Sequence, residues 1–177
     1  MTNYKIGFVG AGKMASAIIK GLIKTGFAKP EELIATQAEK DTLEEKSKLL
    51  GIKVISDNKE LANSVNTVFI ATKPNQVEGV LAEISPYITS EKLVVSIAAG
   101  VTTTKLEAGL PEGTRVIRVM PNTPALVGEG MSGMVGGKNA KTEDLEYIKE
   151  LLSTIGRCIV VDNEAQIDIV TAISGSG

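Results

Sequence analysis

The sequence predicts an α/β fold of the Rossmann type, a doubly wound and mostly parallel sheet with helices on both faces. Strand-like and helical patterns alternate along the 177 residues, and this alternation is typical of parallel strands joined by right-handed crossovers. In addition, the glycine-rich turn at residues 10–15 follows the first strand pattern and precedes the first helical one. Its G-x-G-x-x-A spacing in a strand–turn–helix context is the dinucleotide-binding fingerprint.

Each small residue of this turn has a separate physical role. Gly10 permits the tight turn, and Gly12 has no side chain to block the approach of a pyrophosphate. Ala15 is small enough for the helix to pack closely against the strand. The N-terminus of the helix offers unpaired N–H groups and a partial positive charge to phosphates.

Runs of β-branched and other apolar residues predict the strands. In chain order they cover residues 4–9, 33–36, 53–55, 67–71, 93–97, 115–119 and 158–161. The runs at 67–71 and 93–97 are almost entirely apolar, which is typical of parallel strands covered on both faces. Residues 128–137 hold five glycines among ten residues and predict a loop followed by an edge strand.

Apolar stripes and capping residues predict the helices between these strands. The first follows the glycine turn, with a stripe formed by Ile18, Ile19, Leu22 and Ile23. The others are expected over 40–50 with Gly51 as C-cap, over 58–64 with Asp57 and Glu60 as a capping pair, over 76–84 before Pro86, over 105–110, over 142–155 with Thr142 as N-cap, and over 164–173.

Composition excludes several classes of function. A net charge of −2 with few aromatic residues argues against a nucleic-acid partner. The absence of histidine excludes imidazole metal sites and histidine-based triads, and no metal site is expected. The single cysteine, Cys158, rules out an internal disulfide and is expected to be a buried thiol in a strand.

The length corresponds to one domain, or to one domain plus a fragment. We expect a dinucleotide-binding domain over 1–162 and the start of a helical domain over 163–177. The chain begins directly with a strand pattern and contains no long apolar span, so a cytoplasmic protein without a membrane partner is expected.

Ligands of such sheets bind beyond the carboxyl ends of the strands. At the end of the second strand, NAD enzymes usually place Asp or Glu, whereas this chain has Thr36 and Gln37. A hydroxyl and an amide can donate to a 2′-phosphate, and Lys40 can supply a positive charge. The pattern therefore favours NADP(H), while Glu39 keeps NAD(H) open.

For two further segments at this edge, both a ligand-binding role and a purely structural role are possible. Lys73 either meets the cofactor or a substrate carboxylate, or is an ordinary loop lysine. Asn122 and Thr123 lie in a stiff loop between Pro121 and Pro124. They either orient a nicotinamide or a substrate, or form a turn in which their polar side chains hydrogen-bond within the turn itself.

Together these segments resemble the pyrroline-5-carboxylate reductase family from Ile6 to Gly177. The glycine turn alone is generic, whereas the run Met120-Pro121-Asn122-Thr123-Pro124-Ala125 followed by Ser174-Gly175-Ser176-Gly177 is specific to this family. The other matching segments are 71–74, 96–101, 127–131 and 171–173.

The resemblance implies hydride transfer from NAD(P)H to the C=N carbon of 1-pyrroline-5-carboxylate, which gives L-proline. The protonated imine is already electrophilic, so positioning two reactants suffices and no catalytic residue is assigned with certainty. By match to the family motifs, the residues implied at the cofactor are Gly10, Ala11, Gly12, Lys13, Met14, Thr36, Gln37, Asn58, Ala71, Thr72, Lys73, Pro74, Ala98, Ala99, Asn122 and Glu164. Among them, Thr36 is expected to face the adenosine 2′ position, and Lys73, Asn122 and Thr123 are the candidates nearest to the substrate.

The family continues beyond the Ser-Gly-Ser-Gly motif into a helical domain that forms a homo-oligomer and supplies most of the substrate pocket. We therefore expect this chain alone to have little or no reductase activity. Two alternatives are a related NADP-dependent oxidoreductase, such as a coenzyme F420-dependent NADP reductase or a β-hydroxyacid dehydrogenase, and a non-enzymatic dinucleotide-binding module. Turnover of pyrroline-5-carboxylate would exclude both.

Overall fold

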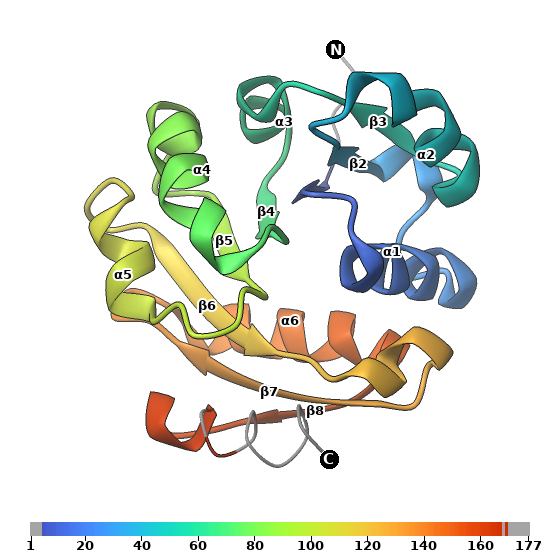
Figure 1. Ribbon diagram of the computed structural model, residues 1–177. Coiled ribbons are helices and arrows are strands. Elements are labelled where there is room, and N and C mark those ends of the chain that lie inside the picture. The colour runs from blue at the N-terminus through green and yellow to red at the C-terminus, as the bar shows by residue number, and fades with distance from the viewer. Residues whose placement is uncertain (1–4, 168, 170–177) are drawn as a thin grey trace.

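The computed structural model describes residues 5–167 and 169 and contains one eight-stranded sheet within that part (Figure 1). The strand order is β3-β2-β1-β4-β5-β6-β7-β8. In chain order, the strands are β1 Ile6–Val9, β2 Leu33–Thr36, β3 Lys53–Ile55, β4 Thr67–Ile70, β5 Leu93–Ser96, β6 Arg115–Met120, β7 Gly130–Gly136 and β8 Gly156–Val160. Neighbouring strands are parallel except for β6 and β7, which are antiparallel. The predicted fold class is therefore confirmed.

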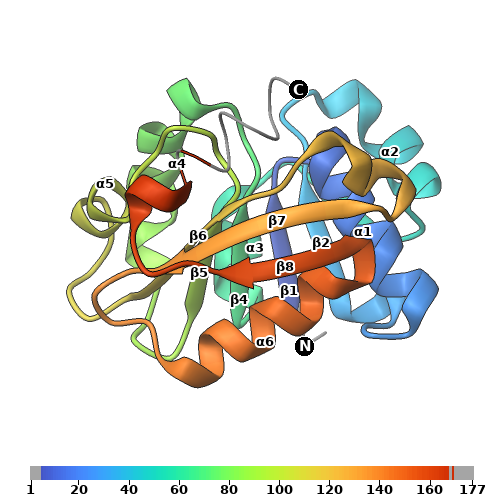
Figure 2. The same cartoon turned by 90° about the horizontal axis from the view of Figure 1, so that it is seen from below.

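Helices cover both faces of the sheet, as the doubly wound topology requires. The α-helices are α1 Lys13–Thr25, α2 Leu43–Leu50, α3 Asn58–Ser64, α4 Val77–Ile84, α5 Thr103–Ala108 and α6 Thr142–Leu152. Short 3₁₀ turns occupy Pro30–Glu32, Lys40–Thr42, Pro74–Gln76, Ser85–Tyr87, Thr123–Val127 and Ser153–Ile155. Figures 1 and 2 show α1 and α6 on the opposite side of the sheet from α4 and α5.

Two apolar cores result from this layering. One contains buried residues of α1, α2 and α6 packed on the sheet, including Ile18, Leu22 and Ile148. The other contains buried residues of α3, α4 and α5, including Leu61 and Leu106. Burial on both faces explains why β1, β2, β4 and β5 are buried at every position.

The glycine-rich segment differs from its prediction as an edge strand. β7 lies inside the sheet, with Met134 paired to Val119 of β6 and Ser132 paired to Cys158 of β8. The true edge is β8, which adds to the far side of β7 (Figure 2). Because β8 comes from a segment about 20 residues further along the chain, local composition did not indicate that β7 would have two neighbours.

The predicted helix caps are confirmed in part. Gly51 is the C-cap of α2, and the Asp57 carboxylate accepts bonds from the backbone N–H groups of Lys59 and Glu60. At α6, however, Thr142 is the first helical residue rather than the cap. The cap position belongs to Lys141, whose N–H donates to the Asp144 carboxylate at 2.9 Å. At this helix start, the Asp144 carboxylate at position N3 accepts the N–H of the cap residue, and the expected hydroxyl cap is absent.

Cys158 is buried, as predicted, with 6% relative exposure on the face of β8 that packs with the α6 core. Burial raises the pKa of its thiol to about 11. A thiol with so high a pKa is an inert core group at neutral pH.

The last predicted helix, 164–173, lies partly outside the described residues. Residues 164–167 are helical and Ile167 is fully buried. Residues 168 and 170–177 lie outside the described part, and so does the Ser174-Gly175-Ser176-Gly177 motif. Within residues 5–167 and 169, no helix has the length and hydrophobicity needed to cross a membrane.

Candidate functional site

The turn between β1 and α1 combines one closed glycine position with one open one. Gly10 has a positive φ of +102°, and a Cβ there would lie 2.8 Å from the carbonyl oxygen of Ala71. Gly12 has an ordinary φ of −72°, and a Cβ there would meet nothing within 4 Å. Gly10 is therefore required by the fold, whereas the space beside Gly12 is open to a ligand.

The N-terminus of α1 begins at this open position. Gly12 is the N-cap and offers no side-chain acceptor to the first N–H groups of the helix. The first turn, which begins with Lys13 and Met14, contains no acidic residue. Backbone N–H donors, the helix dipole and the exposed Lys13 together favour a bound anion such as a pyrophosphate.

The loop after β4 closes the other side of the turn. The N–H of Ala71 donates to the carbonyl of Val9 at 2.9 Å, which holds this loop beside the end of β1. The Thr72 methyl lies 3.3 Å from the position that a Gly10 Cβ would occupy. Within residues 5–167 and 169, Thr72 Oγ1 is the buried side-chain oxygen that has no hydrogen-bond partner. A buried hydroxyl without a partner is costly, so a polar group arriving at this turn would find a donor beside it.

Lys73 and Pro74 follow on the exposed side of the same loop. The N–H of Lys73 donates to Gln76 Oε1 at 3.3 Å, and Pro74 begins the short 3₁₀ turn before α4. The Lys73 side chain carries an exposed charge at the carboxyl end of β4, which leaves both of its predicted roles open.

The end of β2 holds Thr36 in a hydrogen bond within the protein. Thr36 is only 3% exposed, and its Oγ1 accepts a hydrogen bond from the N–H of Gly10 at 3.1 Å. Its hydroxyl oxygen therefore faces the glycine turn, and its predicted place at the adenosine 2′ position stays a prediction. Gln37 is half-buried, and its amide donates to the Glu39 carboxylate at 3.1 Å. The polar surface at this corner consists of Gln37, Glu39 and Lys40.

The structure places the remaining predicted residues on four other segments. Asn58, the first residue of α3, donates its amide to Glu83 of α4 at 2.8 Å. Ala98 is buried and Ala99 is exposed in the loop after β5. Both side chains are single methyl groups at the carboxyl end of β5, and the predicted room for a ligand there stays a prediction.

Asn122 and Thr123 follow β6, and they differ in exposure and in hydrogen bonding. Asn122 Oδ1 accepts a hydrogen bond from the N–H of Met131 at 2.9 Å, which joins this loop to the start of β7. The side-chain amide oxygen of Asn122 is thus engaged with β7, and both predicted roles of this residue stay open. Thr123 is exposed and begins a 3₁₀ helix.

Glu164 holds the chain after β8 against the middle of the sheet. Its Oε1 accepts from the N–H of Thr103, at the start of α5, at 2.7 Å. It also lies 3.3 Å from Nη1 of Arg118, a β6 residue whose side chain is 3% exposed. Sequence reasoning missed Arg118, although an arginine within an otherwise apolar strand pattern signals a buried partner of opposite charge.

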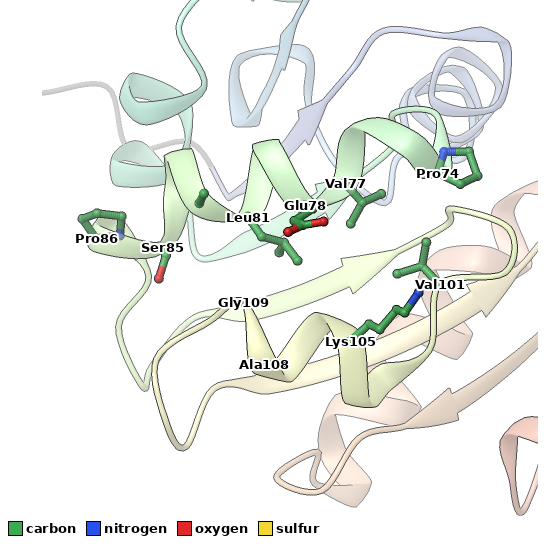
Figure 3. Close-up of a pocket in the computed structure, with 11 residues that line it drawn as sticks. Pro74, Val77, Glu78, Leu81, Ser85, Pro86, Val101, Lys105, Ala108 and Gly109 are labelled. Atoms are coloured by element: carbon green, nitrogen blue, oxygen red, sulfur yellow. The ribbon is translucent and has the colours of Figure 1, made fainter.

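A groove of about 680 Å³ lies between α4 and α5 (Figure 3). Pro74 and Val101 stand at one end of it and Pro86 at the other. Its polar side chains are Glu78, Ser85 and Lys105, and the rest of the lining is mainly apolar. The uncapped N-terminus of α1 at the glycine turn is not among the residues that line this groove.

Comparison with known proteins identifies the family. Residues 5–100 match the sequence model of the family described as NADP oxidoreductase, coenzyme F420-dependent. The chain belongs to this family. The matched residues contain β1 through β5, and so include the glycine turn and the loops after β2, β4 and β5.

Relatives that match along the whole chain carry a more specific name. A pyrroline-5-carboxylate reductase of Methanosarcina acetivorans is 46% identical over 177 residues, which are 100% of this chain and 65% of that protein. The solved structure of a pyrroline-5-carboxylate reductase from Coxiella burnetii has a TM-score of 0.92 at 33% identity and covers 99% of this chain and 65% of that one. A Plasmodium falciparum pyrroline carboxylate reductase, solved with NADP bound, has a TM-score of 0.86 at 35% identity and covers 99% of this chain and 63% of that one.

These matches confirm the resemblance to the pyrroline-5-carboxylate reductases. The chain spans slightly less than two thirds of the length of these relatives. What it shares with the two solved structures is the fold along almost its whole length.

Proposed function

We propose that this chain binds a nicotinamide dinucleotide, NADP(H) in preference to NAD(H), at the carboxyl edge of its sheet. The observation that carries the proposal is the open space at Gly12 in front of the uncapped N-terminus of α1. The family match and the NADP-bound relative from Plasmodium falciparum support the cofactor class. Residues 1–162 would form the binding domain, and 163–177 would begin a helical domain.

The phosphates would lie against the backbone of Gly10–Met14, with the Lys13 ammonium and the Thr72 hydroxyl as further donors. The adenosine end would face Gln37 and Asn58. In this arrangement Gln37 and Lys40 would favour a 2′-phosphate, while the Glu39 carboxylate would oppose it.

The nicotinamide end would lie toward the loops after β4, β5 and β6, which contain Lys73, Ala98, Ala99, Asn122 and Thr123. The small residues there leave room for the ring, and the exposed Lys73 ammonium would attract a substrate carboxylate. We do not assign Glu164 to the cofactor, because its carboxylate already binds the Thr103 N–H and Arg118.

We further propose that the chain is the cofactor-binding part of a pyrroline-5-carboxylate reductase. The reaction would reduce the C=N bond of 1-pyrroline-5-carboxylate to L-proline, with bound NAD(P)H supplying the hydride and a proton completing the amine. The 46% identity along the whole chain supports this assignment. Cytoplasmic location, homo-oligomeric assembly and weak activity of the chain alone belong to the same proposal.

Calorimetric titration of the 177-residue chain with NADPH, and separately with NADH, tests the binding proposal. Binding of both, with a lower Kd for NADPH, is expected. Failure to bind either dinucleotide would refute the proposed role of the glycine turn. Equal or tighter NADH binding would refute only the preference, and would point to Glu39 as the dominant charge at the adenosine corner.

The reaction is tested by following NADPH oxidation at 340 nm with pyrroline-5-carboxylate. The assay uses this chain and, in parallel, the longest natural form of the protein that contains it. Turnover by the longer form and little by the chain is expected. Tight NADPH binding without turnover in either form would favour the non-enzymatic binding module.

A further inference from the structure

The hydroxyl of Thr36 connects the second strand to the glycine turn. Thr36 is the last residue of β2, and β1 and β2 are paired with Phe8 opposite Ala35. This register brings the Thr36 side chain beside Gly10, whose N–H donates to Oγ1 at 3.1 Å. The two residues are 26 positions apart, so the bond is a tertiary contact and not a local turn feature.

Gly10 is held from two sides. Thr36 accepts its N–H on one side, while the Ala71 carbonyl and the Thr72 methyl occupy the space where a side chain would project on the other. The positive φ of Gly10 then sends the chain toward Gly12 and the first turn of α1. The direction of the phosphate-facing N–H groups therefore depends on how Gly10 is fixed.

Thr36 has almost no surface with which to contact a ligand. Its relative exposure is 3%, whereas Gln37 is half-buried and Glu39 is exposed. A side chain that reads the adenosine 2′ position must reach the cofactor surface, and Gln37 and Glu39 meet this condition where Thr36 does not.

We propose that Thr36 is a positioning residue for the glycine turn, acting through the Gly10 N–H, and that it strengthens binding of NADPH and NADH to the same extent. The inference rests on the proposed function, because it requires that the chain binds a nicotinamide dinucleotide. On this proposal, Gln37 and Glu39 discriminate between NADPH and NADH, and Thr36 does not.

The test compares Thr36→Val with Thr36→Ser. Valine keeps the shape of threonine but removes the acceptor, which leaves the Gly10 N–H without its partner, while serine keeps the oxygen. Titration calorimetry with NADPH and NADH is expected to show Kd values about tenfold higher for Thr36→Val with both dinucleotides. The ratio of the two Kd values should stay unchanged, and Thr36→Ser should bind both within about threefold of the unsubstituted chain.

Gln37→Ala provides the matched control, because it removes the neighbouring side chain at the cofactor surface. It is expected to change the ratio of the two Kd values. A Thr36→Val protein that loses affinity for NADPH alone would overturn the proposal, since that is the behaviour of a 2′-phosphate reader. Unchanged affinity for both dinucleotides would overturn it as well.

Hydrogen exchange of the Gly10 amide gives a second, ligand-free measurement for the case that Thr36→Val does not fold. We expect this amide to exchange at least about a hundredfold more slowly than in an unstructured peptide, both in the unsubstituted chain and in Thr36→Ser. Rapid exchange in either would overturn the proposal. If the unsubstituted chain bound neither dinucleotide, the proposed function would fail, while the exchange rate would still test the Thr36 contact.

Discussion

Replacing Gly12 with alanine should weaken cofactor binding at least about tenfold without disturbing the fold. Gly12 has an ordinary φ of −72°, and the added Cβ would meet no protein atom within 4 Å. Alanine is a poorer N-cap than glycine by about 0.5–1 kcal/mol. It also reduces the conformational freedom of the unfolded chain by about 0.4–1 kcal/mol, which acts in the opposite direction. The net change in unfolding free energy is therefore within about 0.5 kcal/mol, a shift in Tm of about 2 °C or less.

The same methyl group occupies the space through which a pyrophosphate would approach the α1 N-terminus. We expect the Kd for NADPH to rise at least about tenfold, which corresponds to about 1.4 kcal/mol or more of binding free energy. Titration calorimetry gives the Kd, and thermal unfolding without ligand gives the Tm. Full NADPH affinity in a folded Gly12→Ala protein would refute the placement of the phosphates at this turn.

Gly10→Ala is the contrasting control two residues away. Its φ of +102° is unfavourable for alanine, and the new Cβ would lie 2.8 Å from the Ala71 carbonyl oxygen. Backbone strain and overlap together should cost about 2–4 kcal/mol. We expect Tm to fall by about 5–15 °C even without ligand. A Gly10→Ala protein as stable as the unsubstituted chain would show that the turn is not held against β4 as described.

Three further predictions concern single side chains. Thr72→Val removes the buried hydroxyl that lacks a hydrogen-bond partner, so the Tm without ligand should rise by about 1–3 °C, while the affinity for NADPH should fall several-fold. A lower Tm in thermal unfolding would contradict the expected gain in stability. Glu164→Gln keeps an acceptor for the Thr103 N–H but removes the charge that faces Arg118, so it should lower the unfolding free energy by about 1–2 kcal/mol in urea titrations. An unchanged unfolding free energy would mean that the ion pair between Glu164 and Arg118 is not formed in solution. With a pKa of about 11, Cys158 should react with iodoacetamide at pH 8 about a hundredfold more slowly than a free thiol until urea unfolds the protein. Rapid alkylation of the folded chain would show that the thiol is accessible.

The local features of the cofactor edge were predictable because they depend on short stretches of sequence. The glycine turn, the buried strands β4 and β5, and the caps at Gly51 and Asp57 each rest on residues within a few positions of one another. Backbone sterics and local hydrogen bonds favour these features, so a short stretch of sequence is enough to predict them. The sequence-based prediction was therefore right about these local elements, and the placement of a ligand at this edge stays a prediction.

The directions of the polar side chains were not predictable, because distant segments decide them. Thr36 turns to Gly10 because β2 pairs with β1, and Asn122 accepts from Met131 because β7 returns antiparallel to β6. Glu164 meets Arg118 across 46 positions. No local pattern contains these partners, so the hydrogen bonds that orient these side chains could not be read from the sequence.

By itself, the sequence determined the fold class, the glycine turn and the small residues at the strand ends, since these follow from periodicity and from backbone conformation. Only the tertiary structure decided that β7 has a neighbour on both sides and that the Thr36 hydroxyl accepts the N–H of Gly10. The physical reason is that hydrogen-bond acceptors and sheet neighbours are shared between segments far apart in the chain. Their assignment becomes fixed only when the strands come together.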